Sequence, residues 1–128
     1  MPEAVTRSIR VEVDPQYVPD QSRPDRDYYF FSYHVTLTNE GEETVQLMSR
    51  HWIITHGDGR VEEVKGPGVV GEQPTLEPGE SFEYTSFCPL HTSTGTMQGT
   101  YQMVTEDGEG FDAKIPLFTL SRENMTYH

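Results

Sequence analysis

Hydrophobic and polar residues alternate with a period of two along most of the chain. Ile9, Val11 and Val13 alternate with polar neighbours, and a longer run of aromatic and β-branched residues extends from 29 to 38. Such alternation is typical of strands that bury one face, whereas no window of about twelve residues shows the period of an amphipathic helix. Five further strands are predicted at Thr44–Thr55, Val61–Val64, Ser81–Phe87, Thr96–Thr105 and Phe111–Leu120.

Turn-forming residues separate the predicted strands. Asn39-Glu40-Gly41 and Asp107-Gly108-Glu109-Gly110 place Gly or Asn where a turn needs positive φ, and Glu77-Pro78-Gly79-Glu80 fits a type II turn. About seven short strands divided by turns predict one all-β domain covering residues 1–128. The predicted fold is an antiparallel β-sandwich of the immunoglobulin or fibronectin type III kind.

An immunoglobulin-like core without its disulfide is predicted around Trp52 and Tyr101. In such sandwiches a tyrosine of strand F binds back to the main chain at a corner, and the second disulfide cysteine follows two residues later. Tyr101 has the place of that tyrosine, and Met103 has the place of the cysteine. We expect Trp52 to fill the core, faced by Val35 or Leu37.

The composition indicates the cellular compartment of the protein and excludes some classes of partner. Nine Lys and Arg face 21 Asp and Glu, a net charge of -12, and this acidity excludes nucleic-acid backbones and anionic lipid surfaces as partners. Cys88 is the single cysteine, the first residues lack the features of a signal peptide, and no apolar run has the length of a membrane span. We therefore expect a cytoplasmic protein. Because exposed edge strands can pair, it is expected to be a monomer or a weak homodimer.

The glycine-rich segment 65–74 spells a GxGxxG motif with Gly66, Gly68 and Gly71. In dinucleotide-binding proteins this motif leads into a helix, but here a proline follows too soon for one. Two interpretations remain open. The glycines permit a tight structural path, or their backbone N–H groups, with Lys65 beside them, form a nest for a phosphate-bearing small molecule.

Candidate chemical groups elsewhere do not converge on a reactive centre. Arg50 and His51 are predicted to contribute to an interaction surface, although alternation places them on opposite faces of their strand. His51 has no acidic partner at a regular spacing, and His51, His56 and Asp58 do not form a metal site because the two histidines point to opposite faces. Cys88 is predicted to be a partly buried loop cysteine. We expect no catalytic residues, no metal and no cofactor.

Several motifs, in order, closely resemble the bacterial ApaG family over residues 5–122. They are Ser49-Arg50-His51-Trp52, Gly66-Pro67-Gly68-Val69-Val70-Gly71-Glu72-Gln73-Pro74, Leu76-Glu77-Pro78-Gly79-Glu80, Thr94-Gly95-Thr96-Met97-Gln98-Gly99-Thr100-Tyr101 and Ile115-Pro116-Leu117-Phe118. The resemblance implies a fibronectin type III-like sandwich and an association with cobalt and magnesium resistance or efflux. It also implies a relation to protein-interaction modules of eukaryotic proteins.

These observations favour a binding module over an enzyme. The leading hypothesis is a non-enzymatic domain that recognises a protein partner, with an indirect link to metal resistance because no membrane segment is present. The alternative is a small-molecule sensor that binds a phosphate-bearing ligand or a divalent ion through segment 65–74, with Lys65, Gly66, Gly68 and Gly71 as its contact residues.

Overall fold

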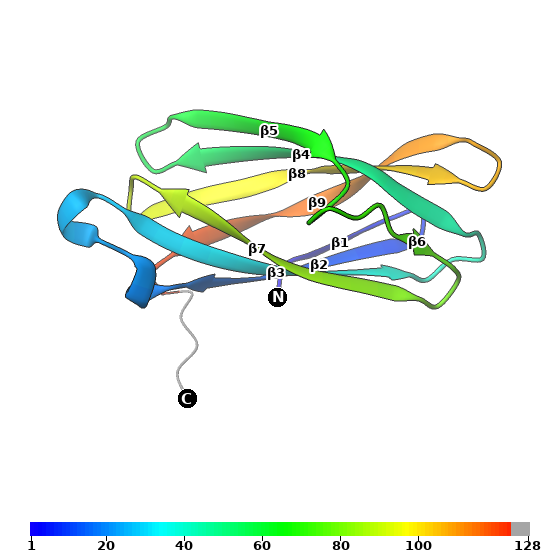
Figure 1. Cartoon of the computed structure of the whole chain (residues 1–128), viewed down its shortest axis with the longest axis horizontal. Helices are drawn as coiled ribbons and strands as arrows, with labels where there is room; N and C mark the ends of the chain where they lie inside the picture. The colour runs from blue at the N-terminus through cyan, green and yellow to red at the C-terminus, as the bar shows by residue number, and fades with distance from the viewer. Residues whose placement is uncertain (124–128) are drawn as a thin grey trace.

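Two antiparallel β-sheets lie face to face in the structure (Figure 1), a computed structural model that describes residues 1–123. One sheet has the order β1-β2-β3-β7 and the other β5-β4-β8-β9, with the short β6 also paired to β4. The strands are β1 (Glu3–Thr6), β2 (Ile9–Tyr17), β3 (Tyr29–Asn39), β4 (Val45–His56), β5 (Val61–Pro67), β6 (Thr75–Leu76), β7 (Ser81–Leu90), β8 (Thr94–Thr105) and β9 (Gly110–Ser121). The predicted antiparallel β-sandwich is confirmed.

All seven predicted strands are present, but residues 1–123 contain nine strands in total. The two that the pattern missed are β1, whose residues are at most half-buried, and β6, which is only two residues long. Strand β6 is too short to display a period of two, and in β1 the apolar Val5 lies on the exposed side, so hydrophobicity does not follow burial there. Strand β2 extends to Tyr17, and two 3₁₀ turns, η1 (Pro19–Gln21) and η2 (Pro24–Arg26), lie between it and β3.

The strand order is that of an immunoglobulin-type sandwich. If β2 is taken as strand A, the neighbours β2-β3-β7 correspond to A-B-E and β4-β8-β9 to C-F-G, with β5 beside β4. One side of the sandwich is closed, since β9 packs against β1 and β2 and the Lys114 N–H donates to Thr6 Oγ1 at 3.1 Å. On the opposite side each sheet simply ends, one at β5 and the other at β7.

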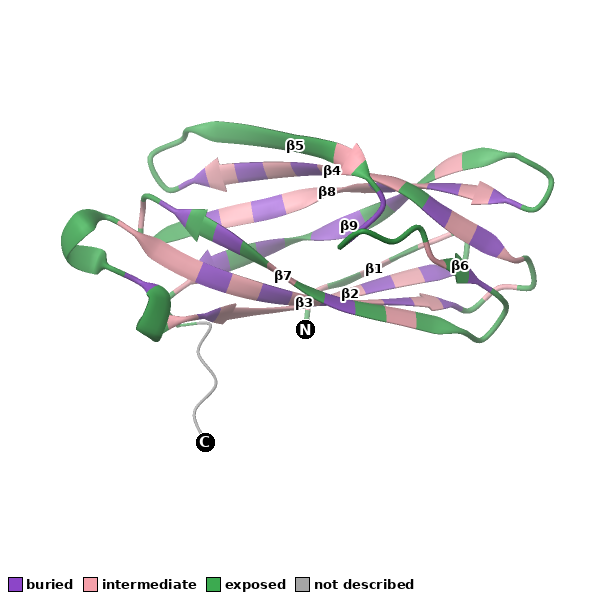
Figure 2. Cartoon of the chain, in the orientation of Figure 1, coloured by how far each residue is buried: buried purple, intermediate pink, exposed green. Residues whose placement is uncertain are grey.

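Alternate residues of the long strands point between the sheets, as the banded colours of Figure 2 show. Trp52 is 3% exposed, and its ring meets those of Tyr33, Tyr101 and Phe118 at centroid distances of 5.2, 6.3 and 6.0 Å. The prediction that Trp52 fills the core is confirmed. Its aromatic neighbour on β3 is Tyr33, whereas Val35 or Leu37 had been expected to face it.

The role predicted for Tyr101 is wrong. Tyr101 lies well inside β8, and its hydroxyl forms a hydrogen bond with the Tyr84 hydroxyl on β7 of the other sheet, where the prediction had a main-chain partner at a corner. Burial raises the pKa of both phenols, so both stay neutral at physiological pH. The pair is a polar link between the sheets, and Met103 packs beside it as an apolar core residue.

Candidate functional site

The outer edge of β5 carries unpaired backbone groups. The Gly68 N–H donates to a carbonyl of β4, so in this antiparallel ladder the even-numbered residues of β5 direct their backbone groups at β4. Val61, Glu63 and Lys65 therefore direct N–H and C=O away from the sheet. Pro67, which has no N–H, occupies the same outward phase, as is usual for proline in an edge strand.

The outer edge of β7 is unpaired in the same way. The Glu80 carbonyl accepts from the N–H of Asn39 on β3, so the odd-numbered residues that follow, including Phe87, point their backbone groups outward. Pro89 again takes an outward position. The open side of the sandwich is thus bordered by two sheet edges that are free within residues 1–123.

A narrow groove of about 160 Å³ lies between these two edges. It is lined by Trp52 and Tyr33, by Val64 of β5 and Phe87 of β7, and by Arg50. Val64 is 39% and Phe87 56% exposed. The groove is mainly apolar, and its rim is formed by the unpaired strands.

Three aromatic rings, on β3, on β7 and on the residue just before β3, form a strip on the outer face of this sheet. Phe30 stacks on Phe87 at 5.4 Å and on Tyr28 at 6.3 Å, with ring planes within 27° of each other in both pairs. We call Tyr28, Phe30 and Phe87 the aromatic strip. The sequence did contain a signal for it, because Phe30 and Phe87 occupy the outward phase of their strands, where polar residues are the rule.

The glycine-rich segment is shaped by contacts within the chain. A β-carbon on Gly66 would lie 3.0 Å from a nitrogen of the Arg50 guanidinium, and Gly68 has φ +58° with the Glu72 carbonyl oxygen 2.2 Å from where its β-carbon would be. Arg50 in turn donates to the carbonyl oxygens of Pro67 and Gly68 at 3.0 and 2.9 Å. Packing therefore accounts for two of the three glycines of the motif.

Some residues of the predicted sites do come together. Lys65, Gly66, Arg50 and His51 line one shallow hollow of about 470 Å³ beside β4 and β5, together with neighbours such as Gln102. Gly68 and Gly71 do not line it. The hollow thus joins part of the predicted anion loop to the predicted interaction residues.

His51 has no acidic partner at a regular sequence spacing, but strand pairing supplies one. Its Nε2 lies 2.7 Å from Oε1 of Glu63, on the neighbouring strand β5. The two residues are twelve positions apart, and the pairing of β4 with β5 brings them together, so no local spacing could reveal it. His51 and His56 point to opposite faces of β4, as predicted: the side chain of His51 is 27% exposed and that of His56 only 1%.

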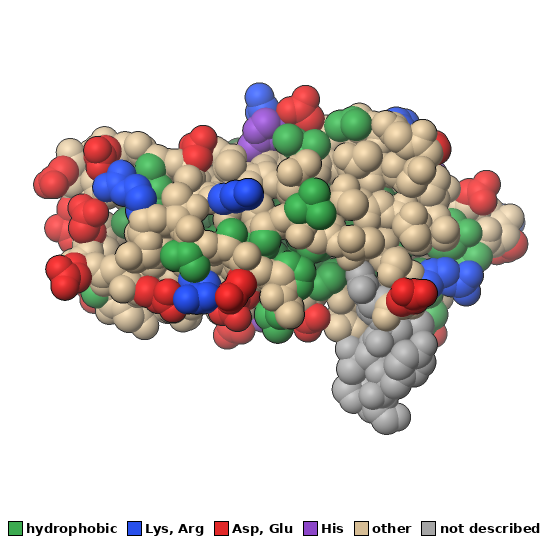
Figure 3. Space-filling model, turned by 180° about the vertical axis from the view of Figure 1, so that it is seen from behind, with side chains coloured by type: hydrophobic (Ala, Val, Ile, Leu, Met, Phe, Trp, Pro, Cys, Tyr) green, Lys and Arg blue, Asp and Glu red, His purple; other side chains and the backbone are tan. Residues whose placement is uncertain are grey.

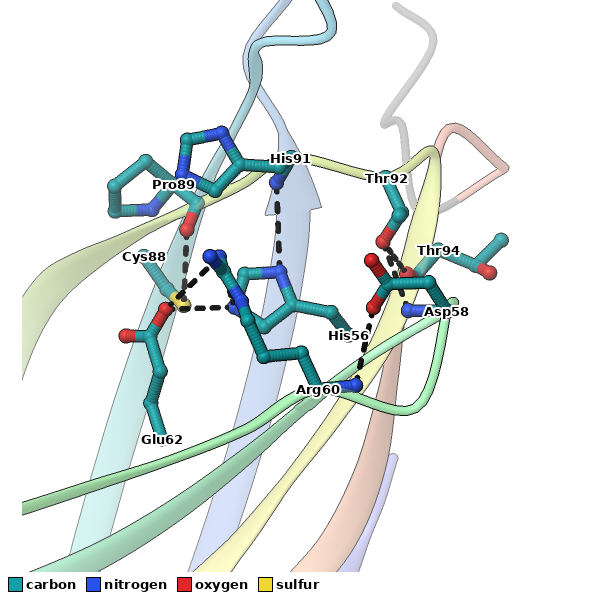
Figure 4. A network of polar contacts seen from close by, with 10 residues as sticks. His56, Asp58, Arg60, Glu62, Cys88, Pro89, His91, Thr92 and Thr94 are labelled. Carbon is teal, nitrogen blue, oxygen red and sulfur yellow. Dashed lines mark hydrogen bonds and ion pairs between the residues drawn. The ribbon is translucent and has the colours of Figure 1, made fainter.

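His56 is the centre of a polar network that joins two turns (Figure 4). The His91 N–H donates to Nδ1 of His56 at 3.4 Å, so Nε2 carries the ring proton and donates to Glu62 Oε1 at 2.8 Å. The His91 ring stacks on it at 5.8 Å. His56 therefore links the end of β4 to β5 through Nε2 and to the residue after β7 through Nδ1.

Cys88 is a buried strand residue, and the prediction of a loop cysteine is wrong, because β7 extends past it to Leu90. Burial, with a smaller contribution from the Glu62 carboxylate, raises the pKa of its thiol to about 12. A thiol with so high a pKa is almost entirely protonated at neutral pH, and the protonated form is a poor nucleophile.

Alkylation of the native protein should therefore be slow. We expect iodoacetamide at pH 8 to modify Cys88 at least about a hundredfold more slowly in the folded protein than in the urea-unfolded protein, followed by mass spectrometry. Native and unfolded rates within a factor of a few would contradict this assignment of Cys88 as a buried core residue.

Among residues 1–123, no three His, Cys, Asp or Glu are grouped so that they could hold a metal ion, and none of the helical segments has the length and apolar character of a membrane span.

Charge is distributed unevenly over the surface. Carboxylates crowd one end of the sandwich, on the left in Figure 3, where the turns contain residues such as Glu42, Glu43 and Asp107. The middle of the face in that view carries few charges.

Comparison with known proteins agrees with this architecture. A family model described as the ApaG domain matches residues 19–105. Protein ApaG of Bradyrhizobium diazoefficiens is 62% identical over 117 residues, which cover 91% of this chain and 90% of that protein. Protein ApaG of Aromatoleum aromaticum is 55% identical over 99% of this chain and 100% of its own length. The crystal structure of a Bordetella pertussis protein called ApaA has a TM-score of 0.87 at 52% identity and covers 94% of each chain. The chain belongs to the ApaG family.

Proposed function

We propose that this chain is a non-enzymatic binding module that recognises a segment of a protein partner along the β7 edge and the aromatic strip. One observation carries the proposal. Phe87 is 56% exposed, is stacked on Phe30, and lies on a strand whose outer backbone groups are unpaired in the described part of the chain. An added strand would hydrogen-bond along β7, and its side chains would alternate between the aromatic strip and the groove.

The chemistry of the strip suits a protein ligand. Stacked aromatic rings offer a large apolar area at little cost in side-chain entropy, and residues of this kind often dominate binding at interfaces. Glu83 lies on the same face of β7 as Phe87, four residues away. Its side chain is 62% exposed, and a hydrogen bond with His34 lowers the pKa of its carboxylate. A partner segment with an apolar residue opposite Phe87 and a cation near Glu83 would complement both.

Site-specific photo-crosslinking tests the proposal. A photoreactive phenylalanine analogue placed at Phe87 is expected to capture one discrete protein from cell extract, and binding of that protein should weaken at least about tenfold for Phe87→Ser. Because Phe87 is mostly exposed, the variant should remain folded.

Leu117 supplies the matched control, since it is a 52% exposed apolar residue on β9. The same analogue at Leu117 should capture no specific protein, and Leu117→Ser should bind the partner as tightly as the unmodified protein does. Equal capture at the two positions would argue against a site at β7.

A second function has one specific observation in its favour. Lys65, Arg50 and His51 line one hollow beside Gly66, and they include two of the nine Lys and Arg and one of the five His of the chain. In this alternative the protein senses a phosphate-bearing small molecule. Pyrophosphate titrated into the protein should then shift the amide resonances of residues 65–68 in a saturable manner. We favour the protein partner because Arg50 already binds backbone carbonyls and His51 binds Glu63.

Within this proposal the protein acts in the cytoplasm. Any role in cobalt or magnesium resistance is indirect, exercised through the partner. The acidity of the chain supports a protein as the partner, because the net charge of -12 disfavours docking on nucleic acid or on anionic membranes.

A further inference from the structure

We propose that two copies of this chain associate through their β5 strands, which pair antiparallel and join the β5-β4-β8-β9 sheets of the two copies into one. The surface needed is present, since β5 ends its sheet and its outer backbone groups have no partner within residues 1–123. The proposal does not depend on recognition of a partner by β7, which lies in the other sheet.

Symmetry restricts how β5 can pair with itself. In an antiparallel pair related by a two-fold axis, the residue at the axis faces its own copy. Full overlap of the seven residues Val61–Pro67 puts Val64 at the axis. Glu63 then faces Lys65 of the other copy, Glu62 faces Gly66, and Val61 faces Pro67.

This register is also the one that charge favours. It forms two Glu63–Lys65 pairs, one on each side of the axis. The registers with Glu62, Glu63 or Lys65 at the axis each set two like charges directly opposite each other, and the register with Gly66 at the axis pairs Lys65 with Pro67 and forms no Glu–Lys pair. Directly opposed like charges destabilise a strand pair, whereas opposite charges stabilise it.

Backbone geometry agrees with the same register. Glu63 and Lys65 direct their N–H and C=O groups outward, so each Glu63–Lys65 pair exchanges two hydrogen bonds. Val64 faces its own copy in the non-hydrogen-bonded type of pair, in which side chains approach most closely. Val64 is 39% exposed in the monomer and lines the groove. The contact between the two copies therefore covers an apolar surface that is open to solvent in the monomer.

The inner face adds a further complementary contact. Gly66 has no side chain, and a guanidinium nitrogen of Arg50 lies 3.0 Å from the position that a β-carbon would take there. Glu62 of the other copy faces Gly66 in this register and would bring its carboxylate, one oxygen of which binds His56 of its own copy at 2.8 Å, towards Arg50. The strand is thus complementary to itself at its outer charges, at its apolar centre and at its inner charges.

A strand pair of this length buries a small area, so we expect a weak dimer with a dissociation constant in the range of about 10 μM to 1 mM. Sedimentation equilibrium over that concentration range measures it. Lys65→Glu and Glu63→Lys should each weaken association at least about tenfold, because both symmetric ion pairs become repulsive. The double exchange, Glu63→Lys with Lys65→Glu, should restore the dimer.

Lys114→Glu makes the same change of charge on β9 and is expected to leave association unaltered. Dilution of the unmodified protein should shift the amide resonances of residues 61–67 and leave those of β7 in place. A chain that stays monomeric at 1 mM, a double exchange that fails to restore association, or a Lys114→Glu variant as impaired as Lys65→Glu would each overturn the proposal. Partner capture at Phe87 is scored separately, so the two proposals can fail independently.

Discussion

Replacing Trp52 by alanine is expected to lower the free energy of unfolding by about 3–5 kcal/mol. Trp52 is 3% exposed, and three aromatic rings, on β3, β8 and β9, contact it edge-on or nearly so. The truncation removes these contacts and leaves a cavity that rigid strands on both sides cannot fill. Urea unfolding followed by tyrosine fluorescence or circular dichroism gives the value.

Phe87→Ala is the control for the loss of a large aromatic side chain. Since Phe87 is 56% exposed, its truncation is expected to cost no more than about 1 kcal/mol. Trp52→Phe should lie between the two. A cost below about 1 kcal/mol for Trp52→Ala would show that Trp52 is not a central member of the core.

Replacing Gly99 by alanine is expected to destabilise the fold by about 3 kcal/mol or more, near the upper end of the usual cost of overpacking. A β-carbon at Gly99 would lie 2.0 Å from the His51 carbonyl oxygen and 3.2 Å from the Trp52 Cα. Both atoms belong to the backbone of β4, which pairs directly with β8 at this point. Neither atom can retreat without opening the ladder between the two central strands of the sheet.

Gly110→Ala gives the matched comparison, because the nearest atom to a β-carbon there is the Met103 carbonyl oxygen at 3.8 Å, an ordinary contact. This variant should differ from the unmodified protein by less than about 1 kcal/mol in urea unfolding. If Gly99→Ala were as mild as Gly110→Ala, β4 and β8 would have to be farther apart than they are here.

Local pattern was sufficient for most of the fold. Strand residues such as Val11, Phe31 and Leu37 are buried because side chains alternate across a strand, a property that depends only on neighbours in sequence. Trp52 was assigned to the core by its place in an immunoglobulin-like order of strands. The pattern could not find β6, since two residues have no period, and it misjudged Tyr101, whose hydroxyl partner Tyr84 is chosen by the opposite sheet.

The candidate site was less accessible to sequence reasoning. Lys65, Gly66, Arg50 and His51 were recognised as neighbours in two short segments, and strand pairing does place them around one hollow. The aromatic strip went unnoticed, although Phe30 and Phe87 both occupy outward positions. They are 57 residues apart in sequence, and only the pairing of β3 with β7 makes them stack.

By itself the sequence determined where the strands run, which side of each faces the core, and that the surface is strongly acidic, because alternation, turn residues and charge are properties of short stretches of chain. The tertiary structure alone decided which strands lie at the edges, which outward side chains meet, and which backbone groups stay unpaired. Those features depend on the partner that each strand finds far along the chain, and the choice is made by the packing of the whole sandwich.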